Sequence, residues 1–220
     1  MSTMATPAKT VRVGVITGST RVVRAGPQVA AFVRSLIEKD LETSALPLPF
    51  KVEIEDVDIA ALSLPIFDEP GIPAYIEVPD GYAHEHTRAW SRRVSALDAF
   101  VFVTPQYNYS VPAGLKNAID YLSKEWQGKP FVVVSYGGHG GTNAAEALQS
   151  ILKNGLRMRA APTTVNLTFP DMEVMGRATK GEDLGLAAGG ESTVWADRGG
   201  DIVQLWRKLA EMVTTPAEEK

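Results

Sequence analysis

The sequence predicts a three-layer α/β domain built around a parallel sheet. Short apolar runs rich in β-branched residues alternate with longer segments of helical periodicity, through five predicted strands and five predicted helices. Polar loops rich in glycine or proline follow the first, third and fourth of these strands. Right-handed crossovers bring the carboxyl ends of parallel strands to one edge of the sheet, so we expect these loops to form one ligand-binding crevice.

The composition limits the class of protein. The chain has 220 residues and a formal net charge of −4, and it has no cysteine, which excludes disulfides, thiolate metal sites and a cysteine nucleophile. No apolar run reaches the roughly 18 residues that span a bilayer, and the first residues lack the apolar core of a signal peptide. We expect disordered tails at 1–9 and 215–220, a single domain over 10–214, and a cytoplasmic protein without membrane or nucleic-acid partners.

The first predicted strand covers residues 11–16, and a loop rich in Gly, Ser, Thr and Arg follows it over 17–26. Pro27 then opens a helix, and the N-terminus of a helix attracts anions through its free N–H groups and its dipole. The loop has neither a Walker A motif nor the pattern G-x-G-x-x-G, which favours a mononucleotide phosphate over ATP or tightly held NAD. Alternatively, Ser19 and Thr20 cap the backbone and the arginines are solvated.

The next part of the chain predicts a strand at 50–59, an irregular connection rich in Pro and Gly over 58–81, and a helix at 82–97. His84 and His86 lie two residues apart in this predicted helix, so we expect them to point to different faces. We therefore expect no metal site there.

The second polar loop follows an apolar strand at 99–103 and precedes a helix at 113–122. Prolines stiffen this loop, polar side chains offer hydrogen bonds in both directions, and tyrosines supply flat apolar surface. These residues are Pro105, Gln106, Tyr107, Asn108, Tyr109, Ser110 and Pro112. The mixture suits a planar heterocycle with polar edges. Alternatively, the loop is an ordinary connection whose tyrosines pack on the protein itself.

The third polar loop follows an apolar strand at 130–135 and has four glycines within 136–143. Glycine lets backbone N–H groups approach a ligand closely. His139 within the loop either positions the backbone or donates a proton. Phosphate, planar ring and glycine-rich edge together indicate FMN, in a doubly wound sheet of order 2-1-3-4-5.

The end of the chain predicts a fifth strand at 163–169 and a closing amphipathic helix at 202–213. Between them, 170–200 is a long glycine-rich segment, and loops of such length inside a compact domain are functional or disordered. We expect a lid or a dimer-contact arm, with a mobile insertion as the alternative.

Three motifs together resemble the NAD(P)H-dependent FMN reductase family, which consists of flavodoxin-like quinone, flavin and azo-dye reductases. The motifs lie at 18–21, 105–120 and 135–141, and the similarity runs from about residue 11 to residue 169. Many family members carry glutamate where this chain has Gln106. The resemblance implies a flavodoxin-like fold and FMN as the cofactor.

The resemblance also implies which residues bind FMN. The phosphate would be held by the first loop, through Ser19, Arg21, Arg24 and Gly26. The ribityl chain and the ring would be met by the second loop, through Pro105, Gln106, Tyr107 and Asn108. The other side of the ring would be met by the third loop, through Ser135, Gly137 and Gly138.

The activity implied by the resemblance is hydride transfer from NAD(P)H through FMN to a quinone, a free flavin or an azo dye, in ping-pong order. The cofactor supplies the chemistry, so no catalytic side chain and no metal are expected, and His139 is only a weak candidate. The family also implies a homodimer or a dimer of dimers. From their place in the sequence, we expect Trp90 and Trp126 in the core or at a dimer interface rather than at a ligand. The alternative is a flavodoxin-like electron carrier, or a flavin-holding protein without its own NAD(P)H turnover.

Overall fold

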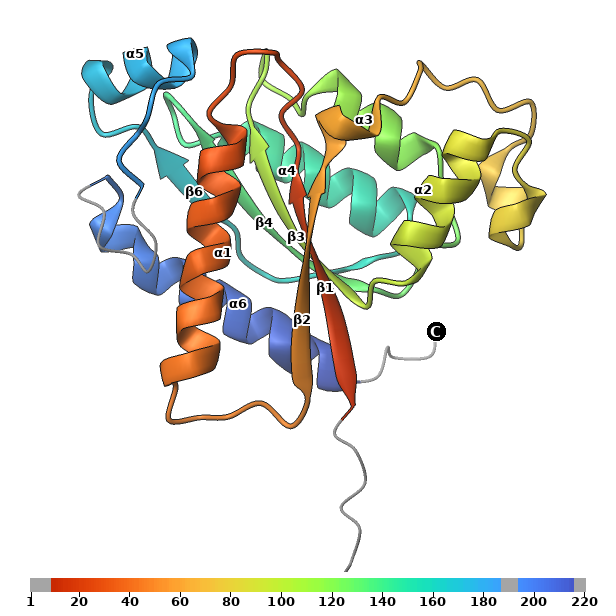
Figure 1. The fold of residues 1–220 in the computed structure, drawn as a ribbon, viewed down its shortest axis with the longest axis horizontal. Helices are drawn as coiled ribbons and strands as arrows, with labels where there is room; N and C mark the ends of the chain where they lie inside the picture. Colours follow the sequence, from red (N-terminus) through yellow and green to blue (C-terminus); the bar gives the residue numbers. More distant parts are fainter. Residues whose placement is uncertain (1–8, 187–193, 216–220) are drawn as a thin grey trace, which may run out of the picture.

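The computed structural model describes residues 9–186 and 194–215 (Figure 1). Of the expected tails, residues 1–8 and 216–220 lie outside the described residues. The same holds for 187–193, within the segment expected to form a lid or an arm.

A parallel sheet in the predicted order forms the centre of the molecule (Figure 1). Its first four positions are β2 (Lys51–Asp58), β1 (Thr10–Thr17), β3 (Ala99–Pro105) and β4 (Pro130–Gly137). Every residue of β3 is buried, as expected for a central strand that is covered by helices on both faces. The strand order 2-1-3-4-5 is that of the flavodoxin-like fold.

The fifth position of the sheet differs from the prediction because two short strands share it. These are β5 (Arg159–Ala160) and β6 (Val165–Thr168), and both pair with β4. Pro162 lies between them. Proline has no N–H to donate to a ladder, so it interrupts a strand at this point.

Helices cover both faces of the sheet, which confirms the three-layer architecture (Figure 1). They are α1 (Gly26–Thr43), α2 (Glu85–Ser95), α3 (Ala113–Asp120), α4 (Thr142–Ser150), α5 (Met172–Lys180) and α6 (Gly199–Thr214). The apolar faces of α1 and α6 share one core cluster with the sheet, and those of α2, α3 and α4 share the other. Trp90 and Trp126 belong to the second cluster and are buried.

Helix α5 is a correction, because its residues lie in the segment 170–200 that the sequence suggested to be a loop. The Asp171 side chain accepts a hydrogen bond of 2.8 Å from the backbone N–H of Val174, which is an N-cap. Gly181 ends the helix with a φ of 69°. Both are ordinary helix boundary signals.

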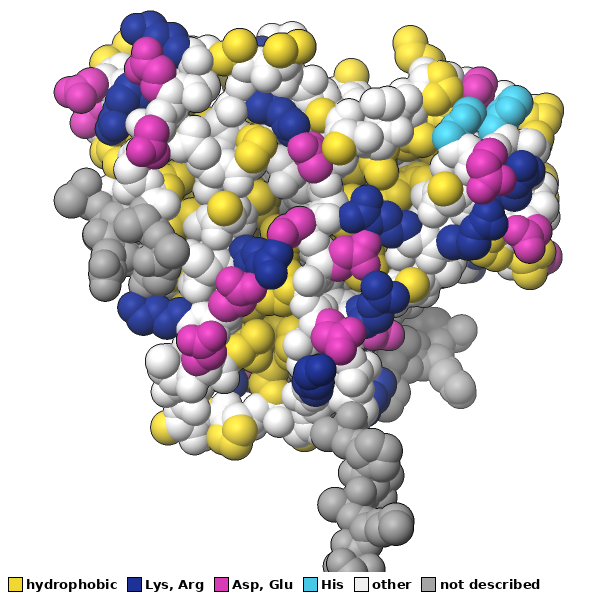
Figure 2. All heavy atoms as spheres, viewed as in Figure 1, with side chains coloured by type: hydrophobic (Ala, Val, Ile, Leu, Met, Phe, Trp, Pro, Cys, Tyr) yellow, Lys and Arg dark blue, Asp and Glu magenta, His cyan; other side chains and the backbone are white. Residues whose placement is uncertain are grey.

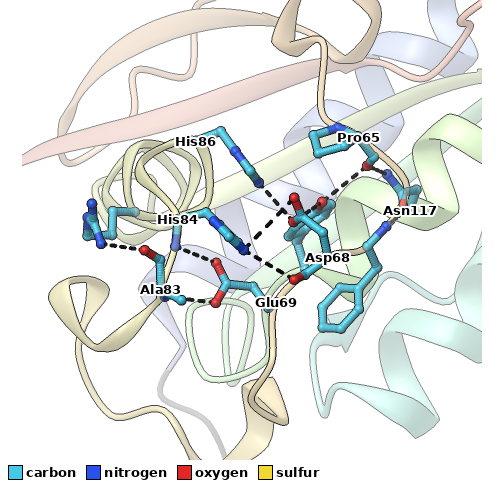
Figure 3. A network of polar contacts seen from close by, with 10 residues as sticks. Pro65, Asp68, Glu69, Ala83, His84, His86 and Asn117 are labelled. Carbon is cyan, nitrogen blue, oxygen red and sulfur yellow. Dashed lines mark hydrogen bonds and ion pairs between the residues drawn. The ribbon is translucent and has the colours of Figure 1, made fainter.

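The connection between β2 and α2 is irregular, as predicted, but it is firmly attached to the body of the protein (Figure 3). The Glu69 carboxylate accepts hydrogen bonds from the backbone N–H groups of Ala83 and His84, at 2.8 and 3.0 Å. On α3, the Asn117 side chain donates to the Pro65 carbonyl at 2.7 Å and accepts from the backbone N–H of Phe67 at 2.9 Å.

The prediction that His84 and His86 point to different faces of a helix is wrong. Helix α2 begins at Glu85, so His84 is extended, and the two imidazole rings stack with centroids 5.2 Å apart and planes 9° apart. The Nε2 atom of His86 lies 3.0 Å from the Asp68 carboxylate, and that of His84 lies 3.2 Å from the Asp68 carbonyl (Figure 3). Among the described residues, no group of three or more His, Asp or Glu side chains could hold a metal ion.

Acidic and basic side chains are interspersed on the face shown in Figure 2. Arg12 and Arg93 both form ion pairs with Glu55, and Arg34 forms one with Asp56. No helix within the described part of the chain is both long enough and apolar enough to cross a membrane.

Candidate functional site

A cavity of about 490 Å³ lies at the carboxyl edge of the sheet, where the loops after β1 and β3 meet the end of β4. This size is in the range of pockets for small organic ligands. Helix α5 and Phe169 complete its wall. The lining residues are Arg21, Val23, Arg24, Ala25, Pro105, Gln106, Tyr107, Tyr136, Gly137, Gly138, Phe169, Met175, Ala178 and Thr179.

The cavity brings together seven of the eleven residues that the sequence suggested for cofactor binding. These are Arg21, Arg24, Pro105, Gln106, Tyr107, Gly137 and Gly138. The other four, Ser19, Gly26, Asn108 and Ser135, do not line it. Contact of any of the eleven with a ligand stays a prediction.

The first loop is closed by an ion pair between Arg24 and Asp58. The guanidinium donates to both carboxylate oxygens, at 2.8 and 2.6 Å, and also to the Ser19 carbonyl at 2.7 Å. The hydrogen bonds from Arg24 hold the pKa of the Asp58 carboxyl below its ordinary value, and the same pairing raises the pKa of Arg24. The guanidinium of Arg21 instead lies over the Tyr107 ring, 3.9 Å from its centroid.

Ser19 and Gly26 form the floor beneath this loop. Ser19 is fully buried, and burial raises the pKa of Tyr136. A β-carbon on Gly26 would lie 1.9 Å from the Ser19 Oγ atom and 2.9 Å from the Tyr136 hydroxyl. Glycine is therefore required here for close approach.

The second loop forms a tight turn in which the backbone groups of Tyr107 and Ser110 pair with each other, at 2.9 and 3.0 Å. Asn108 and Tyr109 have φ values of 49° and 62°, as in a type I′ turn. Both side chains are exposed. Asn108 is thus exposed and is not among the residues that line the cavity, and its contact with a ligand stays a prediction.

Gln106 joins the second loop to the third. Its Oε1 atom accepts hydrogen bonds from the backbone N–H groups of Asn143 and Ala144, at 3.1 and 3.4 Å. These groups belong to the first turn of α4, where N–H groups have no partner within the helix. The Gln106 side chain thus caps α4 from another loop while it also lines the cavity.

The third loop is held in place by the side chain of Ser135. This buried hydroxyl lies 2.7 Å from the Gly140 carbonyl and 2.8 Å from the Asn166 side-chain oxygen. Gly137 and Gly138 line the cavity. His139 is exposed and does not line it.

Seven lining residues were not predicted as site residues, and most of them lie in or beside helix α5. The helix contributes Met175, Ala178 and Thr179. Phe169 precedes α5, and its ring stacks on Trp195 with centroids 5.5 Å apart. The capping residues Asp171 and Gly181 are the sequence signals from which this helix, and so this wall, could have been predicted.

The donor set of the cavity fits a phosphorylated planar heterocycle such as FMN. The cationic side chain of Arg21 lies at the first loop, and the rings of Tyr107, Tyr136 and Phe169 supply flat apolar surface. At the opposite loop, a β-carbon on Gly138 would approach the Met175 sulfur to 3.3 Å. The absence of this β-carbon leaves space between the third loop and α5.

Known proteins match both the sequence and the fold. The family described as NADPH-dependent FMN reductase matches residues 11–170. The chain is 50% identical over 149 residues to the NAD(P)H-dependent FMN reductase LOT6 of Saccharomyces cerevisiae, covering 67% of this chain and 75% of that protein. It is 33% identical over 141 residues to the quinone reductase of Escherichia coli, covering 61% of this chain and 65% of that protein.

A solved structure shares the fold. FerB, a flavoenzyme NAD(P)H:(acceptor) oxidoreductase from Paracoccus denitrificans, matches with a TM-score of 0.58 and 23% identity, over 91% of this chain and 98% of that one.

Proposed function

Because this chain belongs to the NADPH-dependent FMN reductase family, we propose that it uses FMN to transfer reducing equivalents from NAD(P)H to a small acceptor. Family membership makes the chain an NAD(P)H-driven flavin oxidoreductase. What we propose beyond this is the acceptor and the order of the reaction. A quinone, a free flavin or an azo dye would be the acceptor, and NAD(P)+ would leave before the acceptor binds. Bound FMN would supply the redox chemistry.

The observation that carries the proposal is that three loops, distant in sequence, line one cavity. The first loop brings a cationic side chain to it, and the third brings glycine backbone. Arg21 at the first loop would bind the phosphate by charge and hydrogen bonds. The ring of Tyr107, held under the Arg21 guanidinium, would orient the planar part of the ligand. The backbone N–H groups of Gly137 and Gly138 would stabilise negative charge that develops at the ring during reduction.

Access to the cavity supports a small diffusing acceptor. Helix α5 forms one wall through Met175 and Thr179, so an acceptor would enter between α5 and the turn at Tyr107–Ser110. The exposed apolar side chains nearby, Val23 and Tyr109, favour an acceptor with apolar, planar surface.

The test is anaerobic addition of NADPH to the purified protein loaded with FMN. We expect the visible absorbance of the flavin to bleach within seconds and to return when a quinone is added, with parallel lines in double-reciprocal initial-velocity plots. Persistent colour after NADPH would instead support the electron carrier or flavin-holding protein. Intersecting lines would contradict only the ping-pong order.

A second prediction concerns His139, which is exposed and does not line the cavity. We expect His139→Ala to change the rate of flavin bleaching by less than about tenfold, which corresponds to about 1.4 kcal/mol in the barrier. Stopped-flow absorbance measures this rate, and the FMN content of the variant is checked from its spectrum. A loss of several orders of magnitude with FMN still bound would make His139 catalytic.

A further inference from the structure

Asp58 lies outside the cavity lining, and its carboxylate pairs with Arg24 of the first site loop. It is the last residue of β2, and its carboxylate accepts two hydrogen bonds from Arg24, at 2.8 and 2.6 Å. The same carboxylate accepts a third, of 3.1 Å, from the backbone N–H of Ala60. Asp58 is thereby fixed from its own side of the sheet, independently of the loop that it holds.

Arg24 transmits this anchoring to the loop. Its guanidinium donates to the Ser19 carbonyl at 2.7 Å and lies 3.4 Å from the Ser19 hydroxyl. Arg24 thus connects two residues of the loop that are five positions apart. The pair is only partly exposed, with 15% of the Arg24 side chain and 34% of the Asp58 side chain accessible. Two-point pairing of this kind fixes geometry as well as charge.

The pairing also gives Arg24 and Arg21 different roles. The charge of Arg24 is offset by Asp58, whereas no carboxylate among the described residues pairs with Arg21. Arg21 therefore provides the uncompensated positive charge at this end of the cavity. Arg24 provides the shape of the loop that presents it.

We propose that Asp58 is a positioning residue for the phosphate-binding loop and acts through Arg24 to hold the loop in its binding conformation. This inference rests on the proposed function, since it requires that the loop binds the FMN phosphate. It assigns to a strand terminus a role in selecting a phosphorylated flavin over one without phosphate.

The test compares the binding of FMN and riboflavin to the purified protein freed of flavin, by quenching of ligand fluorescence. Riboflavin lacks the phosphate, so the ratio of the two dissociation constants isolates the contribution of the loop. We expect Asp58→Ala to reduce the preference for FMN about tenfold while riboflavin affinity changes less than about twofold. Asp56→Ala is the matched control, because Asp56 lies on the same strand and pairs with Arg34 instead. It should leave the ratio unchanged.

An unchanged ratio in Asp58→Ala would overturn the inference. An increased preference for FMN would also overturn it, because the carboxylate would then act mainly by repelling the phosphate. If Asp58→Ala does not fold, Asp58→Asn retains an acceptor for one Arg24 bond, and we expect it to lower the ratio by a smaller factor. An unchanged ratio of dissociation constants in the folded Asp58→Asn variant would also overturn the inference.

A double-mutant cycle tests whether Asp58 acts through Arg24. In an Arg24→Gln background, Asp58→Ala should leave the ratio unaltered, because the ion pair between the two residues is already lost. A further tenfold loss in that background would overturn the inference. If the unsubstituted protein binds neither flavin, the proposed function fails as well, whereas a normal FMN preference that ignores Asp58 removes only this inference.

Discussion

Gly26 lies beneath the first loop, where Ser19 and Tyr136 leave no room for a β-carbon. Gly26→Ala should lower the free energy of unfolding by about 1–3 kcal/mol, the usual range for overpacking, because the new carbon would lie 1.9 Å from the Ser19 Oγ atom. Urea denaturation measures the change.

The control for this substitution is Gly155→Ala. A β-carbon at Gly155 would meet no atom within 4 Å, so its effect should stay within about 0.5 kcal/mol. Equal stability of the Gly26 variant and the original chain would show that the floor can rearrange.

At the residue scale, the sequence motifs identify the right loops but do not decide which side chains face the cavity. Ser135 and Tyr136 are neighbours on β4, and successive strand residues point to opposite faces. The structure places Tyr136 at the cavity and Ser135 beneath the third loop. Asn108 was likewise suggested as a ligand, but it lies in a turn with positive φ values and is not among the residues that line the cavity. Both differences depend on backbone geometry that the motif alone does not specify.

At the scale of elements, the strands and helices around the first four sheet positions follow the predicted order, because each has a clear apolar pattern. The fifth position was harder to predict, since it is shared by two short strands, β5 and β6, with Pro162 between them. Helix α5 was not predicted because abundant glycine in 170–200 suggested a loop. The capping residues Asp171 and Gly181 mark its ends nevertheless.

The N-cap of α5 leads to a prediction about this wall of the cavity. Asp171→Ala removes the acceptor for the Val174 N–H and should weaken the helix by about 1 kcal/mol. Amide hydrogen exchange in residues 172–180 should accelerate about fivefold, as measured by mass spectrometry. Glu173→Ala is the control, because Glu173 lies in the first turn but does not cap it. Equal exchange in both variants would contradict the role of Asp171.

At the scale of the whole molecule, the segment between β2 and α2 exposes large apolar side chains although its backbone is well anchored. Ile66, Ile72 and Tyr75 are 90%, 63% and 80% exposed, and large apolar side chains left exposed along one segment are typical of interaction sites. The family resemblance implies a homodimer, so we expect a second copy of the chain to cover this segment.

Light scattering coupled to size exclusion tests this expectation. The unsubstituted protein should elute at a multiple of 23.7 kDa, and Ile72→Glu should shift it toward the mass of one chain because a buried unpaired charge is costly. Leu46→Glu, at another exposed apolar position, should leave the mass unchanged. A single-chain mass for the unsubstituted protein would exclude the dimer.

The stacking of Phe169 on Trp195 also gives the molecule an optical property. Phe169 lines the cavity, and the indole is fixed behind it by a hydrogen bond of 2.6 Å from its Nε1 atom to the Thr168 carbonyl. An indole emits in the near ultraviolet, where a yellow chromophore absorbs. Radiationless energy transfer would therefore lower the emission of Trp195 when a flavin fills the cavity, and the protein would report flavin binding without an attached dye.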